Sequence, residues 1–151
     1  MEKKDLVNFL DNQFVPIGFK RKGNNWIKNE QDINKIINLQ KSQYSNAFYI
    51  NYSYNINCLP LNGFVNHISS RLGSLDKLEQ ERITDLLNLE NDIEPIIRFS
   101  ELEKFIIDKI VYQMISTNSE KDILNVLKQR KYLHTIPPHV LKHFNLTIKS
   151  I

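Results

Sequence analysis

INKIINLQKSQYSNAFYINYSYNINC, residues 33–58, is the stretch that decides the fold of this chain. It predicts two antiparallel β-strands joined by a polar turn at residues 42–46. Successive side chains of a strand point to opposite faces of a sheet, and the second strand alternates in that way. The mainly apolar set is Phe48, Ile50, Tyr52, Tyr54, Ile56 and Cys58. The more polar set is Tyr49, Asn51, Ser53, Asn55 and Asn57. The pattern predicts a sheet with one packed face and one wetter face.

The residues before this stretch predict one helix and a hairpin. Leu6, Phe9, Leu10 and Phe14 recur at helical spacing, which predicts an amphipathic helix at about residues 3–14. Residues 19–27 predict two short strands around a Gly-Asn-Asn turn. With residues 33–40 and 47–58 this gives a meander of about four antiparallel strands, with a bend or fraying expected near residues 55–58.

The residues after it predict mainly helices. Ser100 and Glu103 form an S-x-x-E capping pattern, which predicts a helix at about 101–116. Ser119 with Asp122 predicts a second at about 120–131, and two prolines at 137–138 open a short last helix. Residues 60–75 fit either a short helix or a short strand. Residues 85–90 fit a strand, although the preceding LDKLEQER is typical of a helix. The expected fold is one α+β domain over residues 1–151, with an N-terminal helix and C-terminal helices packed on one face of the sheet.

Composition narrows the class of protein. The chain has 151 residues, of which 41% are hydrophobic and 25% charged, as in globular domains. Its net charge of +3 falls short of a typical nucleic-acid binder. A single cysteine, Cys58, excludes an internal disulfide and a Cys-based zinc site, and its place in the alternation predicts a buried thiol. Without a signal-type N-terminus or a membrane-length apolar run, we expect a cytoplasmic protein that does not enter a membrane.

The wetter face is the main candidate binding surface. Gln40, Lys41 and Ser42 end one strand, and Asn51 and Ser53 lie on its neighbour. Their amides and hydroxyls suit a hydrogen-bonding platform for a peptide, nucleotide or protein, and the alternative is a solvated face plus a turn. Ile36 and Tyr49 share this face, and such a mixture is typical of interfaces. The candidate binding residues are Gln40, Lys41, Tyr49, Asn51, Ser53, His67 and Arg71.

Other polar clusters give weaker hypotheses. His67 and Arg71 share a side whether their segment is helix or strand, so they form a possible enzyme site for a phosphate or carboxylate. The alternative is a salt link from this pair to Glu79 or Asp76. Lys20, Arg21, Lys22 and Lys28 beside Trp26 suit nucleic acid, or else a solubilising hairpin edge.

Metal and catalytic motifs are weak in this sequence. His139 and His143 have the i,i+4 spacing of zinc ligands, but Lys142 between them disfavours a cation. No P-loop, dinucleotide fingerprint or nucleophile elbow is present. We therefore expect no metal, no cofactor and no catalytic residues.

Several segments resemble the bacterial domain-of-unknown-function family 4304. They are GFKRKG at 18–23, Trp26, INLQKS at 37–42, FYIN at 48–51, Arg71-Leu72-Gly73 and Asp85-Leu86-Leu87. The resemblance implies a bacterial stand-alone domain and carries over no activity or catalytic residue. The acidic stretch at 79–94, which balances the basic hairpin, favours a protein partner over nucleic acid, as do the mixed polar and aromatic face and the lack of catalytic motifs. By analogy with other small bacterial domains, that role is an immunity or antitoxin function.

Overall fold

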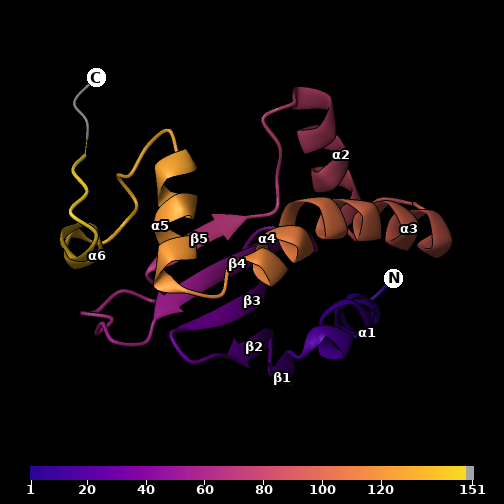
Figure 1. Ribbon diagram of the computed structural model, residues 1–151. Coiled ribbons are helices and arrows are strands. Elements are labelled where there is room, and N and C mark those ends of the chain that lie inside the picture. The colour runs from indigo at the N-terminus through magenta and orange to yellow at the C-terminus, as the bar shows by residue number, and fades with distance from the viewer. Residues whose placement is uncertain (149–151) are drawn as a thin grey trace.

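The computed structural model describes residues 1–148 and shows a meander of five antiparallel strands with six α-helices around it (Figure 1). The sheet order is β1-β2-β3-β4-β5, so each strand pairs with its neighbour in sequence. The elements are α1 (Lys3–Phe14), the 3₁₀ turn η1 (Val15–Ile17), β1 (Lys20–Lys22), β2 (Asn25–Asn29), β3 (Ile33–Lys41), β4 (Phe48–Ile56), β5 (Ile68–Arg71), α2 (Lys77–Leu87), α3 (Pro95–Ile106), the π-helical turn η2 (Ile107–Val111), α4 (Tyr112–Ser116), α5 (Glu120–Gln129) and α6 (Pro138–His143). The α+β prediction is confirmed, with one strand more than expected.

The packed face of the sheet follows the alternation in β3 and β4. Ile33 pairs with Ile56 and Leu39 with Ile50, and all four side chains are buried. Fully burying each of them contributes roughly 1.5 to 3 kcal/mol before the entropy cost. On β2, Trp26 joins this face opposite Ile37. The core of the molecule therefore lies against one side of the sheet.

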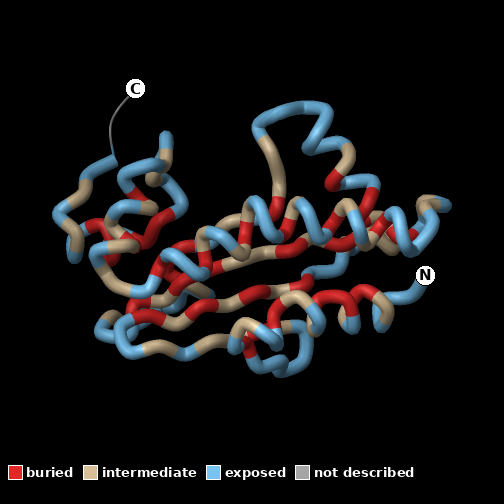
Figure 2. The backbone as a smooth tube through the Cα atoms, turned by 45° about the vertical axis from the view of Figure 1, so that its right-hand side comes forward, coloured by how far each residue is buried: buried red, intermediate tan, exposed pale blue. Residues whose placement is uncertain are grey.

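Helices cover that packed face. Figure 1 shows α4 and α5 in front of the sheet, and Figure 2 shows buried positions where helices and strands meet and exposed positions on the outer helical turns. The Phe9 ring of α1 stacks on the Phe99 ring of α3, with centroids 4.6 Å apart. Leu102, Ile106 and Ile110 are buried along the α3–η2 segment. The described helices all pack on this side of the sheet, so none of them covers the other side of β3 and β4, which is called the bare face below.

The structure settles or corrects the predictions for three segments of the chain. Residues 68–71 form a strand, which settles the open choice for that segment. Residues 85–87 end α2 and form no strand; Asn88 makes an isolated bridge to Ala47, and the N–H of Leu89 donates to the carbonyl of Asn46. The helix expected to start at 101 begins at Pro95, because proline suits a first helical turn. Ser100 is therefore interior to α3 and caps nothing, whereas Ser119 caps α5 as predicted by accepting from the N–H of Asp122.

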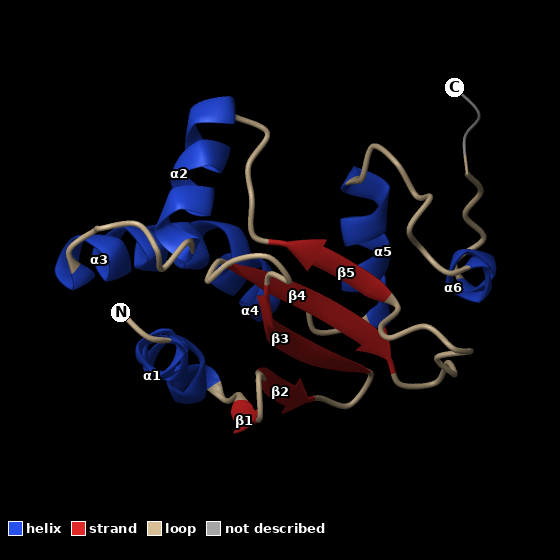
Figure 3. Ribbon diagram, turned by 180° about the vertical axis from the view of Figure 1, so that it is seen from behind, coloured by secondary structure: helices blue, strands red, loops and turns tan. Residues whose placement is uncertain are grey.

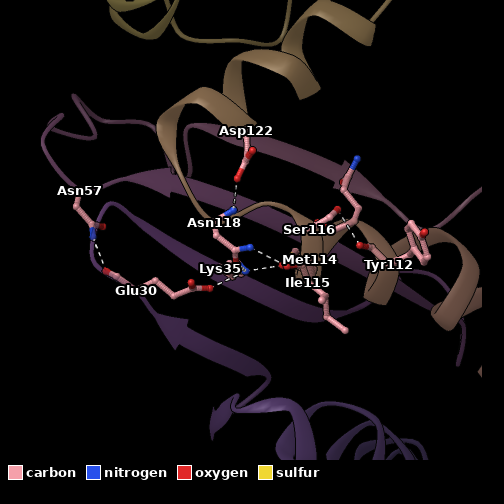
Figure 4. Close-up of polar contacts among 10 residues, drawn as sticks. Glu30, Lys35, Asn57, Tyr112, Met114, Ile115, Ser116, Asn118 and Asp122 are labelled. Atoms are coloured by element: carbon pink, nitrogen blue, oxygen red, sulfur yellow. Dashed lines mark hydrogen bonds and ion pairs between the residues drawn. The ribbon is translucent and has the colours of Figure 1, made fainter.

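A buried lysine ties the sheet to the helical layer. Lys35 is 1% exposed, and its Nζ lies 2.6 Å from Glu30 Oε1 and 2.8 Å from Asn118 Oδ1 (Figure 4). The same ammonium donates to the carbonyl of Met114 in the last turn of α4. The C-terminal end of a helix favours a cation, so Lys35 acts as a cap delivered from β3.

A buried arginine caps the C-terminal end of α2. Arg98 of α3 is 1% exposed and donates to the carbonyls of Leu86, Asn88 and Asn91. These carbonyls end α2 and line the turn into α3, so the guanidinium closes that turn. Burial lowers the pKa of Arg98 from its ordinary value.

None of the helices among residues 1–148 combines the length and apolarity needed to cross a membrane.

Candidate functional site

The bare face of the sheet carries a row of amides that crosses three strands and ends at an arginine on a fourth. Asn25 of β2 pairs with Asn38 of β3, which pairs with Asn51 of β4, which pairs with Arg71 of β5. In Figure 3 the sheet is seen from behind, and no helix among residues 1–148 lies in front of β3 and β4. The amide row, defined as Asn25, Asn38, Asn51 and the adjacent Gln40, is therefore open to a partner.

Hydrogen bonds connect the amide row from end to end. Asn38 Nδ2 donates to Asn25 Oδ1 at 2.9 Å, and Asn51 Nδ2 donates to Asn38 Oδ1 at 3.1 Å and to Gln40 Oε1 at 2.9 Å. These bonds define the orientations of the Asn38 and Asn51 amides, because the nitrogen of each donates to a neighbouring oxygen. Side chains held in this way lose little further entropy when a partner binds.

Arg71 closes the row at β5. Its Nε donates to Asn51 Oδ1 at 3.1 Å and its Nη2 to Gln40 Oε1 at 3.0 Å. The guanidinium carbon also lies 4.0 Å from the centroid of the Tyr49 ring, which is a cation–π contact. Arg71 remains exposed despite these contacts, so a positive charge is held in a fixed place on the surface.

The next row on the same face is aliphatic and hydroxylic. Lys20, Ile27, Ile36, Ser53 and Ser69 pair in turn across the five strands. The two serine hydroxyls lie 3.0 Å apart, and Ser53 is buried while Ser69 is exposed. Two half-buried isoleucines beside an amide row provide apolar contact area next to directional hydrogen bonds.

The charge of this face has one sign. Its cations are Lys20, Lys22 and Arg71, and no carboxylate occurs among the residues of the five described strands. Of the carboxylates near the hairpin, Asp11 pairs with Arg21 at 3.1 Å and Glu30 lies with Lys35 on the packed side. A partner surface of negative charge is thus the complementary one.

Four of the predicted binding residues lie together on this face. Gln40, Tyr49, Asn51 and Arg71 form one contact network, and Ser53 lies in the adjacent row. Lys41 does not belong to it, because Lys41 pairs with Phe48 and so points to the opposite side of the sheet.

His67 is also separate from this face. It is 1% exposed, its Nδ1 accepts from the N–H of Ile56 at 2.9 Å, and its Nε2 lies 2.8 Å from the carbonyl oxygen of Pro60. Both ring nitrogens are thus used within the fold, and burial lowers the pKa of His67. Arg71 stands about 13 Å further along the strand direction, so the proposed His67–Arg71 enzyme site is not formed. The alternative salt link to Glu79 or Asp76 is not formed either, because Glu79 pairs with Lys109 and Asp76 caps α2 by accepting from the N–H of Glu79.

The basic hairpin does not form a stacking platform. Trp26 is fully buried, and its Nε1 donates to Asp11 Oδ1 at 2.8 Å. Arg21 pairs with the same carboxylate, and the aliphatic end of Lys28 lies over Gly18. Only Lys20 and Lys22 of this cluster extend from the bare face.

Cys58 differs from its prediction. The strand ends at Ile56, so the alternation stops there and Cys58 falls in an exposed turn. Its Sγ lies 3.8 Å from Glu120 Oε2. The thiol therefore does not belong to the core.

Asn25, Asn38 and Lys35 were missed by the sequence analysis. The sequence held the information for two of them, because every second residue of a strand points to the same face. Asn38 alternates with Ile36 and Gln40, and Lys35 alternates with Ile33 and Ile37. Extending the alternation from the second strand of residues 33–58 to the first would have placed Asn38 and Lys35 on the correct faces.

These features define a small α+β domain with one helix-covered sheet face and one bare, amide-rich face. The chain belongs to the family described as Domain of unknown function (DUF4304), which matches residues 10–129. The resemblance found in the sequence is thereby confirmed. No curated protein and no solved structure matches the chain. The matched range contains all five strands, so the bare face lies within the part of the chain that defines the family.

Proposed function

We propose that this chain is a non-enzymatic, cytoplasmic protein-binding domain of bacteria, and that it docks an acidic protein surface on the bare face of its sheet. The observation that carries the proposal is the amide row, hydrogen-bonded across β2, β3 and β4 and closed by Arg71 on Tyr49. An immunity or antitoxin role, in which the partner is a toxin, is the specific form suggested by analogy.

The size of the face supports this proposal. At about 4.8 Å between strands and 3.4 Å per residue, the five strands together cover roughly 500 Å². That area is somewhat more than half of the 800 Å² or so that each side of an ordinary protein interface buries. The flanking turns supply the remainder.

The composition of the face supports a protein more than nucleic acid. Trp26 is buried and Arg71 covers one side of the Tyr49 ring, so this face offers little aromatic surface on which bases could stack. Lys20, Lys22 and Arg71 supply few phosphate contacts, whereas Ile27 and Ile36 add the apolar area typical of protein interfaces.

A cavity near the C-terminal end of α5 is a weaker candidate site. It measures about 630 Å³, and its lining includes Lys128, Arg130, Lys131, Tyr132 and His134. Arg130 already donates to the carbonyl of Ser69 and the hydroxyl of Ser70. Most of the lining falls after residue 129 and so outside the family match.

The test is capture from the native host with three versions of the full chain as bait. The wild type is expected to retain an acidic protein at one-to-one stoichiometry after nuclease treatment. Arg71→Glu should weaken the measured affinity at least about 10-fold, since a central cation is reversed. The control is Lys104→Glu, an exposed residue of α3 on the helical side with the same charge change.

Three results would overturn the proposal. They are the absence of any stoichiometric protein, equal retention by wild type and Arg71→Glu, and capture that disappears with nuclease. The last result would identify nucleic acid as the partner.

A further inference from the structure

Cys58, Glu120 and His143 meet at one end of the molecule, away from the bare face of the sheet. Cys58 lies in the turn after β4, Glu120 is the first residue of α5, and His143 is the last residue of α6. Figure 1 shows these elements gathered at the same end of the sheet. The thiol sulfur, one carboxylate oxygen and one imidazole nitrogen lie within 4.8 Å of one another.

The three groups already contact one another. His143 Nε2 is in contact with Glu120 Oε1, and Cys58 Sγ lies 3.8 Å from Glu120 Oε2. In a tetrahedral zinc site, metal–ligand bonds of about 2.0 to 2.3 Å place the ligand atoms roughly 3.3 to 3.6 Å apart. The distances between the three ligand atoms therefore reach tetrahedral values after only a small movement of Cys58, which lies in an exposed turn.

The electrostatics of the cluster suit a cation better than a nucleophilic thiolate. The Glu120 carboxylate lies beside the Cys58 thiol and opposes a negative charge on its sulfur. A divalent cation bound between the two groups reverses this balance, because it attracts both the carboxylate and the thiolate. Lys121 and Lys142 neighbour the ligands in sequence, but both are exposed and their charges are solvated.

We propose that Cys58, Glu120 and His143 bind a zinc ion, with water in the fourth position. Sulfur, nitrogen and oxygen ligands together match the borderline softness of zinc, and three protein ligands leave one position open. The ion joins the end of β4 to α5 and α6. A single cysteine excludes a zinc site built from cysteines, and Lys142 disfavours one built on the His139–His143 pair, but neither argument covers a mixed set of ligands. The structure instead uses His143 without His139, which faces the Pro60 carbonyl.

The first test is titration of the tag-free full chain with cobalt(II) as a spectroscopic substitute for zinc. We expect one equivalent to bind, with a near-ultraviolet thiolate-to-cobalt band that zinc abolishes. Cys58→Ser should lose this band, and Glu120→Gln and His143→Ala should each weaken binding at least about 10-fold. The matched control is His134→Ala, an exposed histidine outside the cluster, which should bind as the wild type does.

The second test uses the fact that Cys58 is the only cysteine in the chain. Zinc is expected to slow alkylation of the wild-type thiol at least about 10-fold, because a bound thiolate is less reactive. The protection should be lost in His143→Ala, with circular dichroism verifying that the fold is kept. An alkylation rate unchanged by zinc, or equal cobalt affinity in wild type and Cys58→Ser, would overturn the assignment.

Discussion

The two faces of the sheet are made from alternate residues of the same strands, yet they are held by different interactions. On the packed face, Ile50 and Leu39 lie opposite each other under the helices and are buried. On the bare face, Asn51 and Asn38 lie opposite each other and are joined by an amide hydrogen bond of 3.1 Å. Hydrophobic burial stabilises the first face, whereas partly buried side-chain hydrogen bonds contribute less net stability to the second. The bare face is therefore the one on which a substitution changes binding more than folding.

The largest expected effect comes from placing a charge on each face in turn. Ile50→Lys should reduce the free energy of unfolding by about 4 kcal/mol or more, because an unpaired ammonium would be buried in the core. Asn51→Lys should cost about 1 kcal/mol through its lost hydrogen bonds. Urea unfolding followed by circular dichroism measures both. Equal tolerance of the two substitutions would contradict the assignment of the faces.

Lys35 is the exception on the packed face and gives the second prediction. Lys35→Met should reduce the free energy of unfolding by about 3 kcal/mol, because it leaves Glu30 and the Met114 carbonyl without their cation. Lys41→Met, an exposed position on the same strand, should stay within about 0.5 kcal/mol of the wild type. The same urea experiment compares them, and a loss for Lys35→Met no larger than that for Lys41→Met would contradict the role of Lys35 as a cap on α4.

The third prediction concerns the pH dependence of stability near His67. Its pKa is lowered in the folded protein by burial, helped by repulsion from His139, so the unfolded chain takes up the proton first. Stability from the neutral ring is thus complete above about pH 6.5 and is lost as the pH falls through the lowered pKa. Unfolding measured from pH 7.5 to 5 should show this loss, and His67→Gln should flatten the profile. A steeper profile in His67→Gln would rule this explanation out.

The smallest effect is expected on the bare face itself. Arg71→Ala should lower the free energy of unfolding by less than about 1 kcal/mol, because Arg71 is exposed and its hydrogen-bond partners can bond to water instead. Thermal unfolding of wild type and variant would measure it. A loss as large as that of Lys35→Met would mean that the amide row is a folding element.

Alternation allowed much of the fold to be predicted from sequence. Phe48, Ile50 and Ile56 on one face and Asn51 on the other follow from a period of two, which is fixed by strand geometry. The period does not say where a strand ends, which is why Cys58 was misplaced. The start of α3 was missed because the pattern at Ser100 outweighed the proline at residue 95.

The candidate site could be predicted only in part. Tyr49, Asn51 and Gln40 were found because they lie on adjacent strands of one hairpin. Their meeting with Arg71 depends on β5, a strand of four residues in a segment with no clear periodicity. The Cys58–Glu120–His143 cluster joins residues 62 and 23 positions apart, so only the packing of α5 and α6 brings them together.

The most direct test of the docking claim is a charge-exchange cycle with the captured partner. Arg71→Glu should weaken the complex, and a lysine at the partner's facing carboxylate should restore affinity to the Arg71→Glu domain while weakening binding to the wild type. A coupling free energy of about 1 kcal/mol or more, measured by calorimetry, is the predicted result. The contrary result is that the two substitutions have additive effects on the binding free energy, whichever carboxylate of the partner's interface is replaced. That result would contradict docking at Arg71.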